Sequence, residues 1–531
     1  MKIVLILEPP NPEALMTLNI DVPGSPDKSF SLCGVLMALT ALARGRSASQ
    51  VDAVLMEVVA ALVAHLTWRR HRNNTFERLE VGLHELLNDT GRAVLAQHVN
   101  RLVEAEPEHI VIDGVLHRRV VAGSGLTLRS PYGPLHVVRA LYRAATERGV
   151  KGARSVGRLE MELGVIDKMT PRMARISARH AALGPSRLSH ELMEEAGLRP
   201  PSRATLDRFA REVGGDFARS LPTTLEAVRS ETEAPPTVAL VLVGMDRVSI
   251  RMHEELEATE SSEPVRKRRT PYMRKPPAPF ETRFRMAYVA SVTLYDDLGR
   301  PLGHFRYAAR ADSDPAELAA QVAADVEWVR RSNPEAGLDV CQDGATDLWK
   351  VLLAALVNLA GPALRKVVDW YHFWQRTYPV LTQLFKPKEV KRWKKALQRE
   401  EGAFERLEKA MWKRVAKSTK VDVHYELVAK YQDYLKARAG LFDYASQWRD
   451  TRRIGSGPIE GTCKLTVNAR CKRSGQRWRP EGATAILALS AAATSRPAND
   501  NPSQQLDRWS AMWDVFASKF THEISQYEVA A

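Results

Sequence analysis

The chain has 531 residues, of which 44% are hydrophobic, and its 77 Lys and Arg against 63 Asp and Glu give a formal net charge of +14 at pH 7. This length exceeds one core of ordinary size, so about two to four domains are expected. The basic balance favours a polyanionic partner, because Lys and Arg that neutralise phosphates gain affinity by releasing counterions. Nucleic acid is therefore the first expected partner, and an anionic membrane surface is the second.

The sequence argues against a membrane-spanning or exported protein. The longest apolar stretch, residues 53–66, contains Glu57 and is too short to cross a bilayer. The N-terminal run reaches Glu8 and two prolines before a signal-peptide core forms. We therefore expect a cytoplasmic protein with no membrane partner. The sequence has four cysteines and no CxxC motif, so neither a zinc ribbon nor a disulfide framework is predicted. The cysteines are Cys33, Cys341, Cys463 and Cys471.

The first 230 residues are predicted to be mainly helical. Residues 1–108 form an expected helical N-terminal region, because apolar residues recur at helical spacing over 51–66 and 76–87. Alternation between residues 109 and 143 predicts a small β-element. Helix openings near residues 171, 186 and 202 make 109–230 a region with a β-element and a helix-turn-helix-like segment.

The third of these helices, over residues 202–213, is the expected recognition helix of a DNA-binding motif. It would offer four polar side chains to a groove, namely Ser202, Arg203, Thr205 and Arg208.

The sequence changes character after a linker at residues 231–236. Strands are expected at 237–252, 284–295 and 303–309, then a helix at 315–331, a strand ending at Asp343 and a helix at 347–359. Three strands followed by helix, strand and helix is the order of a ribonuclease H-like domain. The expected fold class is thus α/β, with a first catalytic part at 237–385, an all-helical insertion at 386–450, a second catalytic part at 451–495 and a tail helix within 496–531.

Three acids mark a candidate metal site. Asp246 closes the apolar run 238–245, Asp343 closes 338–342, and Glu460 lies in a glycine-loosened turn. Phosphodiester cleavage and strand transfer need two divalent metals held by carboxylates, and Mg²⁺ prefers oxygen ligands. The three acids form one cluster if the strands that carry the aspartates are neighbours and the turn folds back over them. Asp339, on the same strand face, competes with Asp343 for this role.

Two further groups of residues support a phosphate-directed site. His372 follows the proposed strands and is a candidate catalytic residue, and Asp369 would fix its tautomer. Directly after Glu460, a basic segment offers phosphate contacts and an aromatic ring for base stacking. The candidate DNA-binding residues of this segment are Lys464, Arg470, Lys472, Arg473, Arg477 and Trp478.

Four short motifs together resemble the signatures of a known family. They are Gly-Met-Asp-Arg-Val at 244–248, Gln-Asp-Gly-Ala at 342–345, Asp-Trp-Tyr-His at 369–372 and Gly-Ser-Gly-Pro-Ile-Glu at 455–460. With residues 468–478 and 482–483, and over about residues 237–495, the chain resembles the bacterial DDE transposases of Kra-type insertion sequences, which are relatives of the Mutator-like transposases.

The resemblance implies a ribonuclease H-like core with a helical insertion before the glutamate, two catalytic Mg²⁺ ions, for which Mn²⁺ can substitute, and cut-and-paste or copy-out transposition. It assigns metal ligation to Asp246, Asp343 and Glu460 and motif roles to Asp369 and His372. Many members carry a cysteine-based zinc motif before the catalytic domain, whereas this chain has no cysteine at residues 140–160.

These observations predict a transposase that binds terminal inverted repeats, cleaves and joins DNA, and forms a homo-oligomer on the paired ends. Two alternatives stay open. One is a domesticated, non-catalytic DNA-binding protein, and the other is a ribonuclease H-like nuclease without strand transfer.

Overall fold

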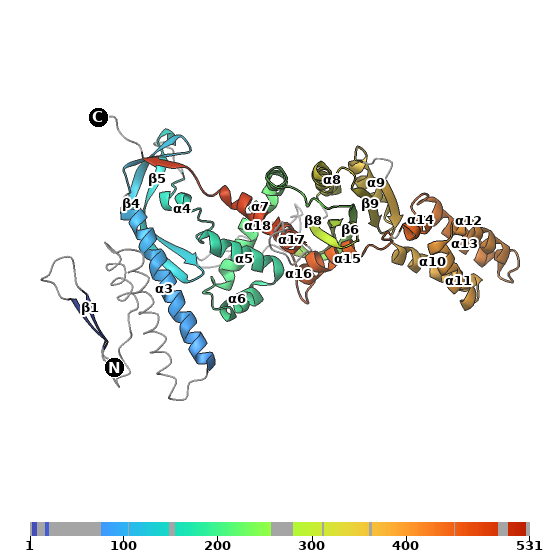
Figure 1. Ribbon diagram of the computed structural model, residues 1–531, viewed down its shortest axis with the longest axis horizontal. Helices are drawn as coiled ribbons and strands as arrows, with labels where there is room; N and C mark the ends of the chain where they lie inside the picture. Colours follow the sequence, from blue (N-terminus) through green and yellow to red (C-terminus); the bar gives the residue numbers. More distant parts are fainter. Residues whose placement is uncertain are drawn as a thin grey trace, which may run out of the picture. The chain divides into compact units, whose positions relative to one another are not determined.

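The computed structural model describes residues 3–7, 16–20, 76–104, 106–147, 154–255, 280–310, 313–359, 364–450, 452–497 and 508–526 (Figure 1). Residue contacts divide the chain into two units, Met1–His98 and Val99–Ala531. The helix predicted at 51–66 lies outside the described residues.

The first unit contains a short β-hairpin and the beginning of a long helix. Strands β1 (Ile3–Leu7) and β2 (Met16–Ile20) pair antiparallel, and α3 (Phe76–Glu104) begins in this unit. The prediction of helix over 76–87 is confirmed. The helical region expected over 1–108 also contains these two strands, which were not predicted, because the periodicity of a short apolar run such as Ile3–Leu7 does not distinguish a strand from a helix.

The second unit opens with the predicted β-element. Strands β3 (His109–Ile112), β4 (Val115–Ser130) and β5 (Gly133–Ala144) are antiparallel, and β12 (Ile524–Gln526) pairs with β3 from the far end of the chain. The order of this four-stranded sheet is β12-β3-β4-β5. The residues predicted as a tail helix therefore also supply a strand. The segment that follows β5 contains η2 (Ala145–Glu147), α4 (Arg158–Glu162), α5 (Pro171–Leu183), α6 (Ser186–Glu195) and α7 (Arg203–Glu231).

The predicted helix openings at α5, α6 and α7 are confirmed, but the third helix is much longer than the predicted 202–213. It has 29 residues and packs along α17 (Pro480–Thr494) and α18 (Arg508–Ser518). Gly214 allows the close approach to α17, because a Cβ there would lie 2.8 Å from Leu489 Cδ1. A core helix of this kind differs from the short recognition helix that was expected.

A six-stranded mixed sheet forms the centre of the second unit. Its order is β10-β9-β6-β7-β8-β11, in which β6, β7 and β8 are antiparallel neighbours and β9 and β10 run parallel to β6. The bounds are β6 (Leu240–Glu255), β7 (Phe280–Tyr295), β8 (Pro301–Ala309), α8 (Pro315–Ser332), β9 (Gly337–Gln342), α9 (Thr346–Leu356), β10 (Leu364–Val368) and β11 (Arg496–Pro497). The predicted order of three strands, helix, strand and helix is confirmed.

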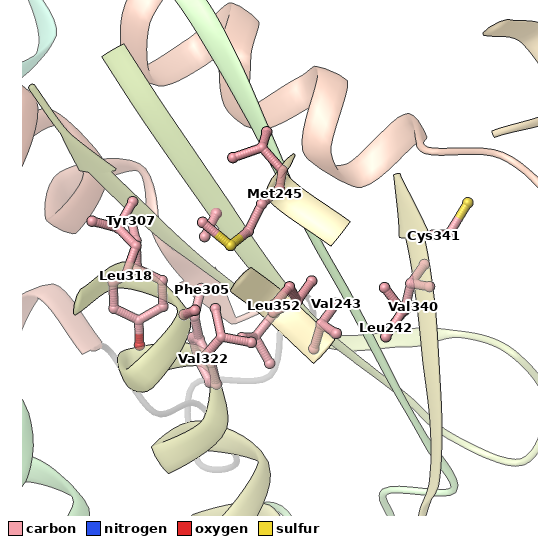
Figure 2. Packing of buried hydrophobic residues seen from close by; sticks show 14 of the residues in the cluster. Leu242, Val243, Met245, Phe305, Tyr307, Leu318, Val322, Val340, Cys341 and Leu352 are labelled. Carbon is pink, nitrogen blue, oxygen red and sulfur yellow. The ribbon is translucent and has the colours of Figure 1, made fainter. Parts of the chain in front are cut away.

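Both faces of the central part of this sheet are buried. Successive side chains of a strand point to opposite faces, and the two main apolar clusters follow this alternation. On one face, Val292 of β7 and Phe305 of β8 pack against α8 and α9; on the other, Val289 and Ala308 pack against the helical segment around Ile459. Figure 2 shows part of the first cluster, which includes Met245 of β6, Tyr307 of β8 and Val322 of α8.

The segment predicted to be helical over 386–450 is helical. After α10 (Trp370–Leu384) come α11 (Pro387–Arg399), α12 (Ala403–Val415), α13 (Val421–Lys436) and α14 (Tyr444–Arg449), which contact one another (Figure 1). The chain then forms α15 (Gly457–Thr462), a π-helical turn η3 (Cys463–Asn468) and α16 (Ala469–Cys471). Within the described part of the chain, no helix combines the length and apolarity needed to cross a membrane.

Candidate active site

The candidate site begins where β6 and β9 separate. Their parallel pairing ends at Val243 and Val340, and Asp246 and Asp343 each follow three residues later. Beyond this point the Gln342 side-chain carbonyl accepts the Met245 amide at 2.9 Å, in place of a backbone partner. Asp343 directly follows β9, as the sequence predicted. The prediction that Asp246 ends a strand is wrong, because β6 continues to Glu255 through its pairing with β7, and Asp246 lies within β6 just beyond the point where β9 stops pairing with it.

Asp246 is a half-buried acid without a cationic hydrogen-bond partner among the described residues. Its Oδ1 accepts the Arg247 amide at 2.7 Å, and its Oδ2 accepts the Cys463 thiol at 3.3 Å. Burial raises the pKa of Asp246, and the negative charge of Asp343 raises it further. Asp343 Oδ1 accepts the Ala345 amide at 2.9 Å. The pair concentrates negative charge that an added cation would compensate.

Asp369 and His372 form a second, tightly connected pair. Asp369 is the N-cap of α10, where its Oδ1 accepts the His372 amide at 2.8 Å and lies 2.9 Å from His372 Nδ1. Its Oδ2 accepts the Ser456 amide, from the loop before Glu460. Burial alone would raise the pKa of Asp369, but the hydrogen bonds from His372 and Ser456 lower it to about 2. Since the ionised carboxylate only accepts, Nδ1 of His372 carries the proton and Nε2 faces away from Asp369.

Glu460 joins this second pair. It lies in helix α15 rather than in the expected turn, because Pro458 starts a helix directly after the glycines. Ligand atoms of Asp369, His372 and Glu460 all lie within 4.8 Å of one another. Among the described residues no such group contains Asp246 or Asp343, so the three predicted ligands lie around one site without forming a closed cluster. Lys464, one helical turn after Glu460, lies 3.5 Å from its carboxylate.

Asp339, the competitor of Asp343, has a structural role. It is buried, and Arg452 Nη1 donates to its Oδ1 at 2.6 Å. This ion pair joins β9 to the segment that leads to Glu460. Asp343 is therefore the strand-end acid that faces the site.

A cleft of about 510 Å³ opens beside Asp343. One wall consists of the strand-end residues and the other comes from α10 and the end of α13 in the helical region. Its lining residues are Arg247, Asp343, Gly344, Ala345, His372, Gln375, Arg376, Tyr434 and Arg438. Three arginines thus surround the access to an acidic centre, which is a suitable arrangement for a phosphate chain approaching bound cations.

The basic segment after Glu460 is exposed only in part. Lys464, Lys472, Arg473 and Arg477 are exposed and remain candidates for phosphate contact. The prediction that Arg470 contacts DNA is wrong, because this side chain is buried and its Nε donates to the Ala181 carbonyl at 2.8 Å.

Burial lowers the pKa of Arg470 to about 10, and its guanidinium lies 4.9 Å from the centre of the Trp478 ring. The Trp478 indole donates to the Cys471 carbonyl at 3.0 Å and packs on the apolar cluster below. Trp478 is thus a packing residue with one ring face covered, rather than the open stacking platform that was expected.

The N-terminal candidates differ in the same way. Arg203 is exposed at the start of α7, whereas Arg208 pairs with Asp167 at 2.8 Å and with Glu212 at 3.4 Å. Ser202 caps α7 by accepting the Thr205 amide. Of these predicted groove residues, Arg203 is the one whose charge is not already paired among the described residues.

Two site residues were not predicted. Cys463 is three residues after Glu460, and that spacing places it on the same helix face, so the motif itself could have indicated it. Gln342 directly precedes Asp343, but no sequence pattern shows that its side-chain carbonyl accepts the Met245 amide of the neighbouring strand. In comparisons with known proteins, no family model, no curated protein and no solved structure matches this chain.

Proposed function

We propose that this chain is a DNA transposase of the DDE type, related to those of Kra-type insertion sequences. The observation that carries the proposal is the meeting of Asp246, Asp343, Glu460 and His372, from segments up to 214 residues apart, beside an arginine-lined cleft. A packing role alone does not account for so many partly exposed acids around one histidine.

We assign the ribonuclease H-like fold to the domain built on the six-stranded sheet. Support comes from its three antiparallel strands followed by two parallel ones, with Asp246 within β6 and Asp343 directly after β9. The helices α11 to α14 then correspond to the insertion that the family resemblance implies.

The donor set fits hard divalent cations. Asp246, Asp343 and Glu460 offer carboxylate oxygens, the ligand type that Mg²⁺ and Mn²⁺ prefer. Burial and mutual repulsion raise the pKa of Asp246, so a cation in the site would relieve an existing electrostatic cost. When bound, two such ions supply activation of the attacking oxygen and stabilisation of the leaving oxygen.

The residues of the chain then have distinct tasks. Asp369 remains ionised and holds His372 with Nε2 directed away from it, where the imidazole can contact a phosphate oxygen. In the first reaction water breaks a phosphodiester bond and releases a 3′-hydroxyl; in the second that hydroxyl attacks a target phosphate and displaces another 3′-oxygen. We expect two copies of the chain to hold two transposon ends in the nucleoid.

The test is an assay of the full-length protein with a labelled transposon-end duplex, target plasmid and Mg²⁺. Wild type should yield cleaved and joined products. Asp343→Asn should reduce both by at least about a hundredfold, since even loss of an outer-sphere partner of a metal costs 10- to 100-fold. Asp297→Asn, an exposed acid in the β7–β8 turn, serves as the matched control and should match wild type.

Other outcomes would select an alternative. Cleavage without joining would favour a nuclease that lacks strand transfer. Tight end binding with neither product would favour a non-catalytic DNA-binding protein, and equal activity of Asp343→Asn would remove this acid from the mechanism.

A further inference from the structure

The cleft beside Asp343 has a second wall whose residues, apart from His372, are not explained by the chemistry of the acids. Helix α10 contributes His372, Gln375 and Arg376, which are three and four residues apart and therefore share one helix face. Tyr434 and Arg438, from α13 and the turn after it, complete the wall.

Arg438 is fixed in place at the edge of the cleft. Its Nε donates to the Gly344 carbonyl at 2.8 Å, its Nη2 donates to the same oxygen, and its guanidinium lies 4.3 Å from the centre of the Tyr434 ring. A Cβ on Gly344 would come within 2.7 Å of this Nε, so a glycine is needed there for the arginine to fit. The cation is thus built into the wall directly beside Asp343.

Arg376 is available for a ligand. It is exposed, lines the cleft, and has no hydrogen bond or ion pair with the residues that the structure describes. Arg247, in the same cleft, is held at 2.8 Å by Asp347. One unpaired guanidinium together with two fixed ones suits a phosphodiester chain, which carries a charge on every nucleotide, better than it suits a single small anion.

Two exposed aromatic rings lie on the helix that carries Arg376, and the centre of the Tyr371 ring is 5.9 Å from that of His372, which lines the cleft. Tyr371 is 60% exposed and Tyr378 is 51% exposed, although both belong to α10, whose other face packs into the core. Tyr371, Gln375 and Tyr378 are four and three residues apart, so the rings flank a cleft residue on one helix face. Exposed rings next to a cationic groove are the combination that binds unpaired bases, because every base can stack on them.

We propose that the exposed face of α10, with Tyr371 and Arg376 on either side of Gln375, binds an unpaired DNA strand that leads to the Asp343 site. Arg376 contacts a backbone phosphate, and Tyr371 stacks on a base displaced from the duplex next to the cleaved bond. This inference rests on the proposed transposase function and adds to it that the strand is opened locally before or during cleavage.

The test measures DNA binding by the full-length protein without divalent metal, so that no cleavage occurs. The probes are a labelled single strand of about 20 nucleotides, the matching duplex, and the same strand with one 2-aminopurine, whose fluorescence falls on stacking. The variants are Arg376→Ala, Tyr371→Ala and Tyr371→Phe. Matched controls are Arg392→Ala, an exposed arginine on α11, and Tyr425→Ala, a 57% exposed tyrosine on α13.

We expect wild type to bind the single strand more tightly than the duplex and to quench 2-aminopurine. Tyr371→Ala should weaken single-strand binding by about 5- to 100-fold and abolish quenching, whereas Tyr371→Phe keeps both within about twofold. Arg376→Ala should weaken binding roughly three- to tenfold and reduce the slope of affinity against salt by about 0.7. Both controls should bind as wild type does.

Three results would overturn the inference: unchanged single-strand binding and quenching in Tyr371→Ala, an Arg376→Ala effect confined to duplex, or losses in the controls equal to those in the variants. The outcome is separable from that of the proposed function. If the protein cleaves and joins DNA but its α10 variants bind normally, the proposed function stands and single-strand binding by α10 is rejected. If the protein does not cleave DNA but its α10 variants bind the single strand weakly, single-strand binding by α10 stands and the transposase function is rejected.

Discussion

Two aspartates of the site have opposite environments, and this difference assigns their tasks. Asp369 receives hydrogen bonds from His372 and Ser456 and has a pKa near 2, so it is a permanent anion that positions its neighbours. Asp246 has a raised pKa because of burial and the charge of Asp343, so it lacks the compensation that a cation would supply. The sequence predicts the acids themselves, but it does not show which of them is already satisfied by protein partners.

A buried histidine near Glu460 gives a prediction about pH. His304 lies between Thr293 (2.7 Å) and Thr462 (3.1 Å), and burial lowers its pKa to about 3. The unfolded chain has the ordinary value of 6.5, so it takes up a proton first as the pH falls, and stability decreases below pH 6.5. Between pH 7 and pH 5 this group should cost about 2 kcal/mol of unfolding free energy.

Urea unfolding of wild type and His304→Gln at the two pH values measures the effect. The variant should be less stable at pH 7, because the buried hydroxyl partners are less well matched, and its loss between pH 7 and pH 5 should be smaller by about 2 kcal/mol. Equal pH dependence of the two proteins would show that His304 is protonated in the folded state.

At the scale of elements, the periodicity of apolar residues and the positions of Pro and Gly predict most helices and strands of the second unit. The strands β6 to β9 and the helices α5, α8 and α11 to α14 follow from alternation, helical spacing and N-terminal prolines. The hairpin β1–β2 and the length of α7 do not, because short apolar runs are ambiguous and because α7 is extended by packing on α17 and α18. The geometry of the site also depends on Gly244, because β6 approaches the Cys341 carbonyl of β9 so closely there that a side chain would not fit.

We predict that Gly244→Ala separates β6 from β9. A Cβ at this position would lie 2.6 Å from the Cys341 carbonyl oxygen, which is backbone and cannot rotate away. The expected loss of unfolding free energy is about 1 to 3 kcal/mol, with a matching fall in activity, as measured by urea unfolding and the cleavage assay. Gly461→Ala, in helix α15 with no atom within 4 Å of its Cβ, should instead be neutral or stabilising by up to about 1 kcal/mol. Similar effects of the two changes would refute the steric argument.

At the scale of the whole second unit, residues 508–526 contact elements that are far away in the sequence. Strand β12 extends the sheet of β3, and α18 packs its Trp509 and Trp513 against Phe217 of α7. Arg508 and Arg229 both donate to the fully buried Asp325 of α8, at 2.9 and 2.8 Å. These partners are 183 and 96 residues away, so no local pattern in the sequence predicts their pairing.

We predict a large cost for removing the shared acid. Although burial opposes its ionisation, Arg508 and Arg229 lower the pKa of Asp325, so it is charged in the folded state. Asp325→Asn would leave two buried guanidinium groups with only neutral partners, namely the new amide, Gln321 and Tyr307, and should lower the unfolding free energy by about 3 to 5 kcal/mol. Urea unfolding near pH 7 measures this loss, and Glu327→Gln, an exposed acid of the same helix, should change it by less than about 0.5 kcal/mol. A loss below 1 kcal/mol in Asp325→Asn would show that the network is not needed for folding.

The most direct test of the central claim is a change of metal preference at Asp343. A thiolate is a poor ligand for Mg²⁺ but accepts softer ions, so Asp343→Cys should cleave the labelled end at least about a hundredfold more slowly than wild type in Mg²⁺ and recover at least about tenfold in Mn²⁺. Wild type should differ little between the two ions. Cleavage by Asp343→Cys at the wild-type rate in Mg²⁺, or the same defect in both ions, would contradict metal ligation by this acid and with it the proposed two-metal site.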